Sequence, residues 1–150
     1  MVPIFISVLI IYLILTRVKV NSSPEAVVRQ VVRLSKYEAY EQYIVNQANL
    51  ESGYFTNTLS QPPINNPFSM SAVRIRPTTQ IDTYSNPAID GGQLFGVYEN
   101  IQSAAEDFIL YLEYIRMPEG LTCKEYNAYI VSKGYAVDPL YEDKLNNMCR

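Results

Sequence analysis

The chain of 150 residues contains no histidine, so its acid–base chemistry has to come from carboxylates, tyrosines and lysines. This absence excludes Ser-His-Asp and Cys-His catalysis, together with zinc sites that need an imidazole ligand. Cys123 and Cys149 are the two cysteines, too few for a four-thiolate metal site. Their spacing is compatible with a disulfide outside the cytoplasm and equally with two buried thiols. We therefore expect a protein that works without a metal ion or a cofactor.

Glu51 is the carboxylate whose position points to acid catalysis. A helix is predicted from about Ser35 to Ser52, with Gly53 as its stop, and its apolar stripe leads to Glu51 through Tyr37, Tyr40, Ile44 and Ala48. A carboxyl group among apolar side chains is harder to ionise, so its pKa rises. A carboxylic acid that stays protonated near neutral pH can protonate the leaving-group oxygen of a glycoside. Periodicity alone favours the simpler interpretation, a solvated glutamate at the helix end.

The segments around this helix predict an α+β fold. Residues 54–98 lose helical periodicity and carry several prolines and a Gly-Gly pair, which indicates an irregular lobe with short strands at 73–76, 79–84 and 93–98. Helices are predicted before and after this lobe, over residues 26–34, 101–116, 122–132 and 138–148. Ser22-Ser23-Pro24-Glu25 is typical of a helix start, and Thr122 with Glu125 predicts a capping box. Because the lobe is inserted into a helical core, we expect the binding site in the cleft between them.

The first residues predict a membrane anchor. Residues 1–16 contain no charged side chain, and Arg17 and Lys19 follow them. Such a helix spans roughly 24 Å of the roughly 30 Å hydrocarbon core, and long basic side chains extend the span by snorkelling. The alternative is a cleaved signal peptide, but no basic residue precedes the apolar run and Val18-Lys19-Val20 is a poor cleavage site. We therefore expect a transmembrane anchor over residues 1–20 and a soluble domain over residues 21–150.

The charges after the anchor favour a particular orientation. The apolar run is followed by five basic residues: Arg17, Lys19, Arg29, Arg33 and Lys36. Because basic residues next to a membrane span tend to stay in the cytoplasm, this pattern favours a domain on the cytoplasmic side. A cell-wall enzyme needs the opposite side, and the internal membrane of a virus particle would remove this conflict. The formal net charge of −3 argues against a nucleic-acid partner, because binding phosphates requires a basic surface.

Four motifs follow one another along the chain: Asn46–Tyr54 (NQANLESGY), Asn65–Phe68 (NNPF), Tyr98–Phe108 (YENIQSAAEDF) and Gly134–Leu145 (GYAVDPLYEDKL). In order and spacing they resemble the motifs of the endo-β-N-acetylglucosaminidase family of peptidoglycan hydrolases, glycoside hydrolase family 73. The resemblance implies a lysozyme-like helical core with a small irregular β lobe. Residues 66–71 lack a glycine and a lysine of the family pattern, so the glycan subsites are expected to differ.

The resemblance also implies roles for particular residues. Glu51 takes the place of the catalytic acid, and Tyr135 that of a tyrosine near the scissile sugar. The resemblance places the second carboxylate in the lobe, and counting back from Tyr98 selects Asp82. Asp82 would act as general base for water or would stabilise the positive charge on the sugar. The N-acetyl group of the substrate could also fill this role. Asp90 is the other candidate, in a Gly-Gly context that is typical of a turn. Substrate contacts are expected from Tyr54, Asn66, Phe68 and Asp90.

The sequence therefore predicts a glycosidase that cleaves the β-1,4 bonds between N-acetylglucosamine and N-acetylmuramic acid in peptidoglycan. It would face the cell wall or periplasm, or lie in a virion membrane, as a phage lysis or virion-associated enzyme. Two alternatives stay open. A lytic transglycosylase needs one acid and leaves an anhydro sugar, and an inactive structural or glycan-binding protein of a virion would bind the wall without turnover.

Overall fold

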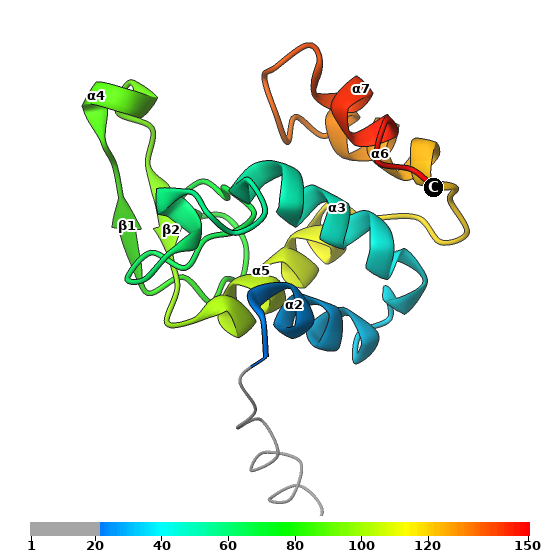
Figure 1. The fold of residues 1–150 in the computed structure, drawn as a ribbon, viewed down its shortest axis with the longest axis horizontal. Helices are drawn as coiled ribbons and strands as arrows, with labels where there is room; N and C mark the ends of the chain where they lie inside the picture. Colours follow the sequence, from blue (N-terminus) through cyan, green and yellow to red (C-terminus); the bar gives the residue numbers. More distant parts are fainter. Residues whose placement is uncertain (1–21) are drawn as a thin grey trace, which may run out of the picture.

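The computed structural model describes residues 22–150. Its helices and strands follow in the order α2 (Pro24–Arg33), η1 (Glu38–Tyr40), α3 (Glu41–Ser52), η2 (Thr58–Ser60), β1 (Asp82–Tyr84), α4 (Pro87–Asp90), β2 (Phe95–Val97), α5 (Ile101–Tyr114), α6 (Cys123–Ser132) and α7 (Tyr141–Asn146). Figure 1 shows α2, α3 and α5 packed together, with the lobe at one end of this group and the α6–α7 pair over its other side. This is the predicted α+β arrangement of a helical core with a small irregular lobe.

Local capping explains where the helices begin and end. The Ser23 hydroxyl accepts a hydrogen bond from the Ala26 amide, and Pro24 occupies the first turn of α2, as predicted. Thr122 and Glu125 form the predicted capping box of α6. One prediction was wrong, because α3 begins at Glu41 and not near Ser35. The Ser35 hydroxyl donates to a carbonyl of α2 and accepts from the Tyr37 amide, which holds these residues in a turn.

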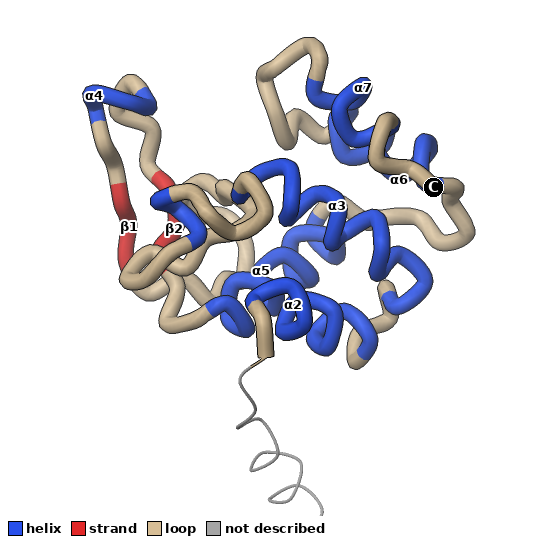
Figure 2. The backbone as a smooth tube through the Cα atoms, viewed as in Figure 1, coloured by secondary structure: helices blue, strands red, loops and turns tan. Residues whose placement is uncertain are grey.

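The lobe contains one hairpin and the short helices η2 and α4, and the rest of it is loop, as Figure 2 shows. The predicted strands at 79–84 and 93–98 are confirmed over shorter ranges, as β1 and β2, which pair antiparallel with Asp82 opposite Val97. We call residues 82–97 the hairpin arm, and the short helix α4 sits at its tip. The predicted strand at 73–76 is not formed. The Val73 amide there donates to the Gln80 side chain and not to a neighbouring strand.

The hydrophobic core lies between the helices and the base of the lobe. Phe68 of the lobe stacks on Phe108 of α5 with ring centroids 4.2 Å apart. Fully or almost fully buried apolar side chains from each surrounding helix complete this core: Val28, Val32, Ile44, Val45, Ala48, Leu112, Tyr126 and Ile130. Packing therefore holds α3, which carries Glu51, on several sides.

A buried ion pair fastens the lobe to α5. The Asp107 carboxylate is fully buried and accepts two hydrogen bonds from Arg76, at 2.9 and 3.0 Å. The Tyr98 hydroxyl donates to the same carboxylate at 2.7 Å, and the Thr79 amide does so at 3.3 Å. Burial alone would raise the pKa of Asp107, but the hydrogen bonds from Arg76 and Tyr98 hold it below its ordinary value. The carboxylate is thus charged and fully partnered.

The C-terminal helices are fastened by different means. A disulfide joins Cys123 at the start of α6 to Cys149 after α7, which decides between the two states that the sequence left open. The Asn46 amide of α3 donates to the Met148 carbonyl at 3.0 Å. The disulfide therefore ties the end of α7 to α6, and the hydrogen bond from Asn46 ties it to the middle of α3.

The predicted anchor over residues 1–20 lies outside the described residues. Within residues 22–150, each helix is too short or too polar to cross a membrane.

Removing the charge of Asp107 is expected to cost about 3 kcal/mol of unfolding free energy, because Asp107→Asn leaves the buried Arg76 guanidinium without its counter-charge. Urea unfolding of the purified protein measures the loss. Glu106→Gln, at the exposed neighbouring position, is the matched control and should change stability by less than about 0.5 kcal/mol. Equal stability of the two variants would contradict the structural role given to Asp107.

Candidate active site

A pocket of about 510 Å³ opens at the C-terminal end of α3, where the core meets the lobe. Leu50 and Glu51 lie at its floor, and Gln93 and Phe95 of the hairpin arm form one wall. The opposite wall consists of residues 134–138 together with Tyr141 and Lys144 of α7. Figure 1 shows the arm and the loop before α7 rising on opposite sides of this end of α3. The pocket is thus the expected cleft between lobe and core.

The chain turns sharply just after Glu51. Gly53 ends α3 with a φ of 56°, and Tyr54 and Phe55 follow with φ values of 57° and 63°. Residues with side chains seldom adopt this left-handed conformation, so surrounding contacts have to stabilise it. The Ser52 hydroxyl supplies one of them by accepting from the Phe55 amide. As a result the helix stops one residue after Glu51, and the side chain of Glu51 reaches the pocket.

The surroundings of Glu51 favour its protonated form. Burial raises the pKa of the Glu51 carboxyl group above its ordinary value. Interactions with the hydroxyls of Tyr141 and Ser69, and the charge of Lys144, lower the pKa again without cancelling this effect. Lys144 is also bound to Asp138, at 2.6 Å, so part of its charge is neutralised. A raised pKa at a pocket floor is what proton donation near neutral pH requires.

Tyr135 joins the two walls. Its hydroxyl donates to the Phe68 carbonyl of the lobe, and its ring lies 6.1 Å from that of Tyr141, measured between centroids. Burial raises the pKa of Tyr135 well above its usual value, and the charge of Glu51 adds to this. Tyr135 therefore stays protonated, and it lines the same pocket as Glu51.

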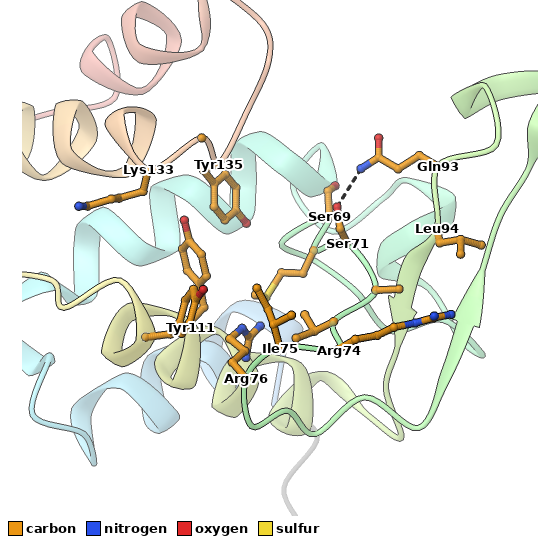
Figure 3. Close-up of a pocket in the computed structure, with 15 residues that line it drawn as sticks. Ser69, Ser71, Arg74, Ile75, Arg76, Gln93, Leu94, Tyr111, Lys133 and Tyr135 are labelled. Atoms are coloured by element: carbon orange, nitrogen blue, oxygen red, sulfur yellow. Dashed lines mark hydrogen bonds between the residues drawn. The ribbon is translucent and has the colours of Figure 1, made fainter.

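A second pocket of about 530 Å³ continues the first. Both are lined by the same five residues at their junction: Ser69, Ser71, Gln93, Gly134 and Tyr135. Figure 3 shows Tyr135 on one side and Tyr111 and Ile75 facing it, with a hydrogen bond from Gln93 to Ser71 on the lobe side. Lys133 also lines this pocket, and its ammonium group lies over the ring of Tyr129. We call the two connected pockets the groove, and Glu51 lines the first of them.

Two other predicted residues, Asp82 and Tyr54, do not line the groove. Asp82 lies exposed on β1, where its carboxylate accepts from the Thr83 amide. Tyr54 is 69% exposed, in the turn after α3. Asp90 ends α4, and its side chain is outside the described part of the structure. The structure therefore brings Glu51 and Tyr135 together but not Asp82.

Asn66 and Phe68 have structural contacts where substrate contacts were expected. Both are fully buried and line neither pocket. The Asn66 amide donates to the carbonyls of Met70 and Gly96, at 2.8 and 2.9 Å, and its oxygen accepts from the Met70 amide. These bonds tie the loop after α3 to β2. A buried, fully bonded asparagine cannot reach a glycan, so the expectation for both residues is corrected.

Sequence reasoning missed the residues of α7. Tyr141 and Lys144 belong to the fourth motif, but the motif itself gave them no role. The contacts of α7 with α3 bring them beside Glu51, 90 or more positions earlier in the chain. Gln47 precedes Glu51 by four residues, and this spacing places both side chains on one face of α3. The spacing was therefore a sequence signal that could have identified Gln47 as a neighbour of the acid. No comparable local signal marks Tyr141.

The comparisons with known proteins agree in family and fold. A family model described as "Mannosyl-glycoprotein endo-beta-N-acetylglucosaminidase" matches residues 30–150. No curated protein sequence matches the chain.

Several solved structures are similar to this one. The glycoside hydrolase domain of FlgJ from Salmonella typhimurium, in a C-terminally truncated form, is 26% identical with a TM-score of 0.55, over 82% of this chain and 88% of that one. The catalytic domain of the autolysin Auto from Listeria monocytogenes is 17% identical with a TM-score of 0.54, over 89% and 87%. A type VI secretion effector–immunity complex from Pseudomonas protegens gives 18% identity and a TM-score of 0.61, over 85% and 92%.

Proposed function

Because the chain belongs to the glucosaminidase family and is therefore a glycoside hydrolase, we propose that it cleaves the glycan strands of peptidoglycan at β-1,4 bonds between N-acetylglucosamine and N-acetylmuramic acid. The observation that carries this proposal is Glu51, a partly buried acid with a raised pKa at the floor of a groove. A groove formed by two connected pockets suits a polymer, because several sugar rings can lie along it. Peptidoglycan hydrolases are also among the solved structures with this fold.

In the proposed reaction Glu51 gives its proton to the glycosidic oxygen as the bond from that oxygen to the anomeric carbon breaks. Water attacks this positively charged carbon and gives its proton to the second carboxylate or to solvent, which leaves a new reducing end. Tyr135 stands beside the acid, with its hydroxyl bonded to the lobe, and shapes the place of the scissile sugar. Its ring, with that of Tyr111, offers a surface on which sugar rings can pack.

Glu51→Gln is expected to lower the rate of hydrolysis by about 100- to 10,000-fold, because glutamine has no proton to donate. Release of reducing ends from purified peptidoglycan measures this rate. Glu119→Gln is the matched control, at an exposed position outside the groove, and should retain wild-type activity. The wild-type rate should fall as the pH rises through the raised pKa of Glu51, since only the protonated form is active.

The same digests separate the alternative functions. A hydrolysed product carries a free reducing end, whereas a lytic transglycosylase leaves an anhydro sugar lighter by one water, which mass spectrometry detects. Wild-type protein that binds the wall but releases no product would identify a structural or glycan-binding protein. Undiminished hydrolysis by Glu51→Gln would remove Glu51 from the proposal.

Asp82 stays the predicted second carboxylate. Because it does not line the groove, it can act only if the hairpin arm bends toward Glu51 when substrate binds. We then expect Asp82→Asn to lower the hydrolytic rate by about 100-fold. Asp143→Asn, at an exposed position of α7 that does not line the groove, is the matched control. Full activity of Asp82→Asn would transfer the role to the N-acetyl group of the substrate.

We also propose that the domain works outside the cytoplasm or in a virion, held by residues 1–20. The disulfide between Cys123 and Cys149 supports such a compartment, because disulfides persist in oxidising surroundings. Fractionation of cells or particles tests this proposal. The protein should stay with membranes after carbonate washing and dissolve in detergent, and recovery in the wash would contradict the anchor.

A further inference from the structure

Beneath Glu51 lies a group of buried polar side chains that the proposed reaction does not use. Gln47 is fully buried on α3, four residues before Glu51 and on the same face of the helix. Its side-chain oxygen accepts from the Tyr126 hydroxyl at 3.3 Å. The nitrogen of the same amide makes no hydrogen bond within the described residues, and neither does the Tyr141 hydroxyl. Buried polar atoms without partners are few in proteins and call for an explanation.

Tyr141 of α7 lies beside Glu51 and interacts with Gln47 as well. Tyr141 is 5% exposed and lines the pocket that contains Glu51. Although it makes no hydrogen bond of standard geometry, its hydroxyl interacts with both the Glu51 carboxyl group and the Gln47 amide. Burial, followed by the charge of Glu51, raises the pKa of Tyr141 far above its usual range. The hydroxyl therefore keeps its proton, and toward a carboxylate it can only donate.

The other groups around Glu51 are already engaged. Tyr135 donates its hydroxyl proton to the Phe68 carbonyl. Lys144 is paired with Asp138, and the Ser69 hydroxyl donates to the Glu51 backbone carbonyl at 3.4 Å. Ser69 and Lys144 still favour the charged carboxylate, but more weakly than Tyr141 does. Tyr141 is thus the unengaged buried donor beside the acid.

We propose that Gln47 and Tyr141 are positioning residues for Glu51: the Gln47 amide holds the Tyr141 hydroxyl, which donates to the Glu51 carboxylate once its proton has gone to the leaving-group oxygen. The inference rests on the proposed function of Glu51. While Glu51 is protonated, it carries no negative charge for a hydrogen-bond donor to stabilise. The Tyr141 hydroxyl is therefore left without a good acceptor. When the negative charge forms in this buried place, a donor already in position stabilises it without rearrangement. Tyr141 keeps its own proton throughout.

The test is the pH dependence of kcat/KM for the full chain in mild detergent, with soluble glycan strands from peptidoglycan as substrate. The basic limb of this profile reports the pKa of Glu51 in the free enzyme. Tyr141→Phe removes a hydrogen bond that favours the carboxylate, so the limb should move to higher pH by about 0.5–1 unit. The maximal rate should fall by about tenfold, with little change in KM, because the lost bond acts after substrate has bound.

Gln47→Met, which keeps the volume of the side chain, should move the limb in the same direction by a smaller amount. Because the two residues act in series, the double variant should resemble Tyr141→Phe alone. Tyr43→Phe is the matched control, two helical turns from Glu51 and outside the groove, and should leave the profile unchanged. Thermal melting of each variant confirms that it is folded, and if Tyr141→Phe does not fold, Gln47→Met carries the test.

Two results would overturn the inference. A lower rate at all pH values with an unmoved limb would mean that Tyr141 only supports the structure. Additive effects in the double variant would mean that Gln47 does not act through Tyr141. Failure of the proposed function would look different, because Glu51→Gln would then retain its activity whatever Tyr141→Phe does.

Discussion

The ion pair between Asp107 and Arg76 is the interaction on which the shape of the groove depends. The lobe has only one short hairpin, so it cannot hold its position through a large sheet. Asp107 instead gathers donors from several points of the lobe, at residues 76, 79 and 98. All of these hydrogen bonds end on one fully buried carboxylate of α5. They therefore fix the position of the lobe relative to the helices. One wall of the groove is therefore set by electrostatics rather than by sheet pairing.

The opposite wall is held by a disulfide and a hydrogen bond. The disulfide from Cys123 to Cys149 and the bond from Asn46 to the Met148 carbonyl keep α7 against α3. Tyr135 then connects the two walls, since its hydroxyl bonds to the Phe68 carbonyl of the lobe. Glu51 lies where these two independent attachments meet. A change in either attachment would alter the surroundings of the acid without touching Glu51 itself.

The buried polar atoms without partners are concentrated near the groove. Within residues 22–150 they belong to Gln47, Asn49, Tyr111 and Tyr141. Tyr111 and Tyr141 line the groove, and the other two lie on the helix that carries Glu51. Each such atom costs stability, as does a carboxyl group held away from water. Gln47, one helical turn before Glu51, and Tyr141, in the same pocket as Glu51, show the pattern of a site that gives up stability for chemistry.

The sequence by itself determined the local features: the cap at Ser23, the capping box at Thr122, the stop at Gly53 and the paired strands of the lobe. It also singled out Glu51 and Tyr135, because short motifs record residues that stand close together along the chain. Only the tertiary structure decided which distant residues surround the acid. Asp107 meets Arg76, Tyr141 meets Glu51 and Cys123 meets Cys149 across 26 to 90 positions, and no periodicity encodes such contacts. The same reason explains why Asn66 was expected in the groove and lies buried: the motif shows that a residue matters, whereas packing decides what it contacts.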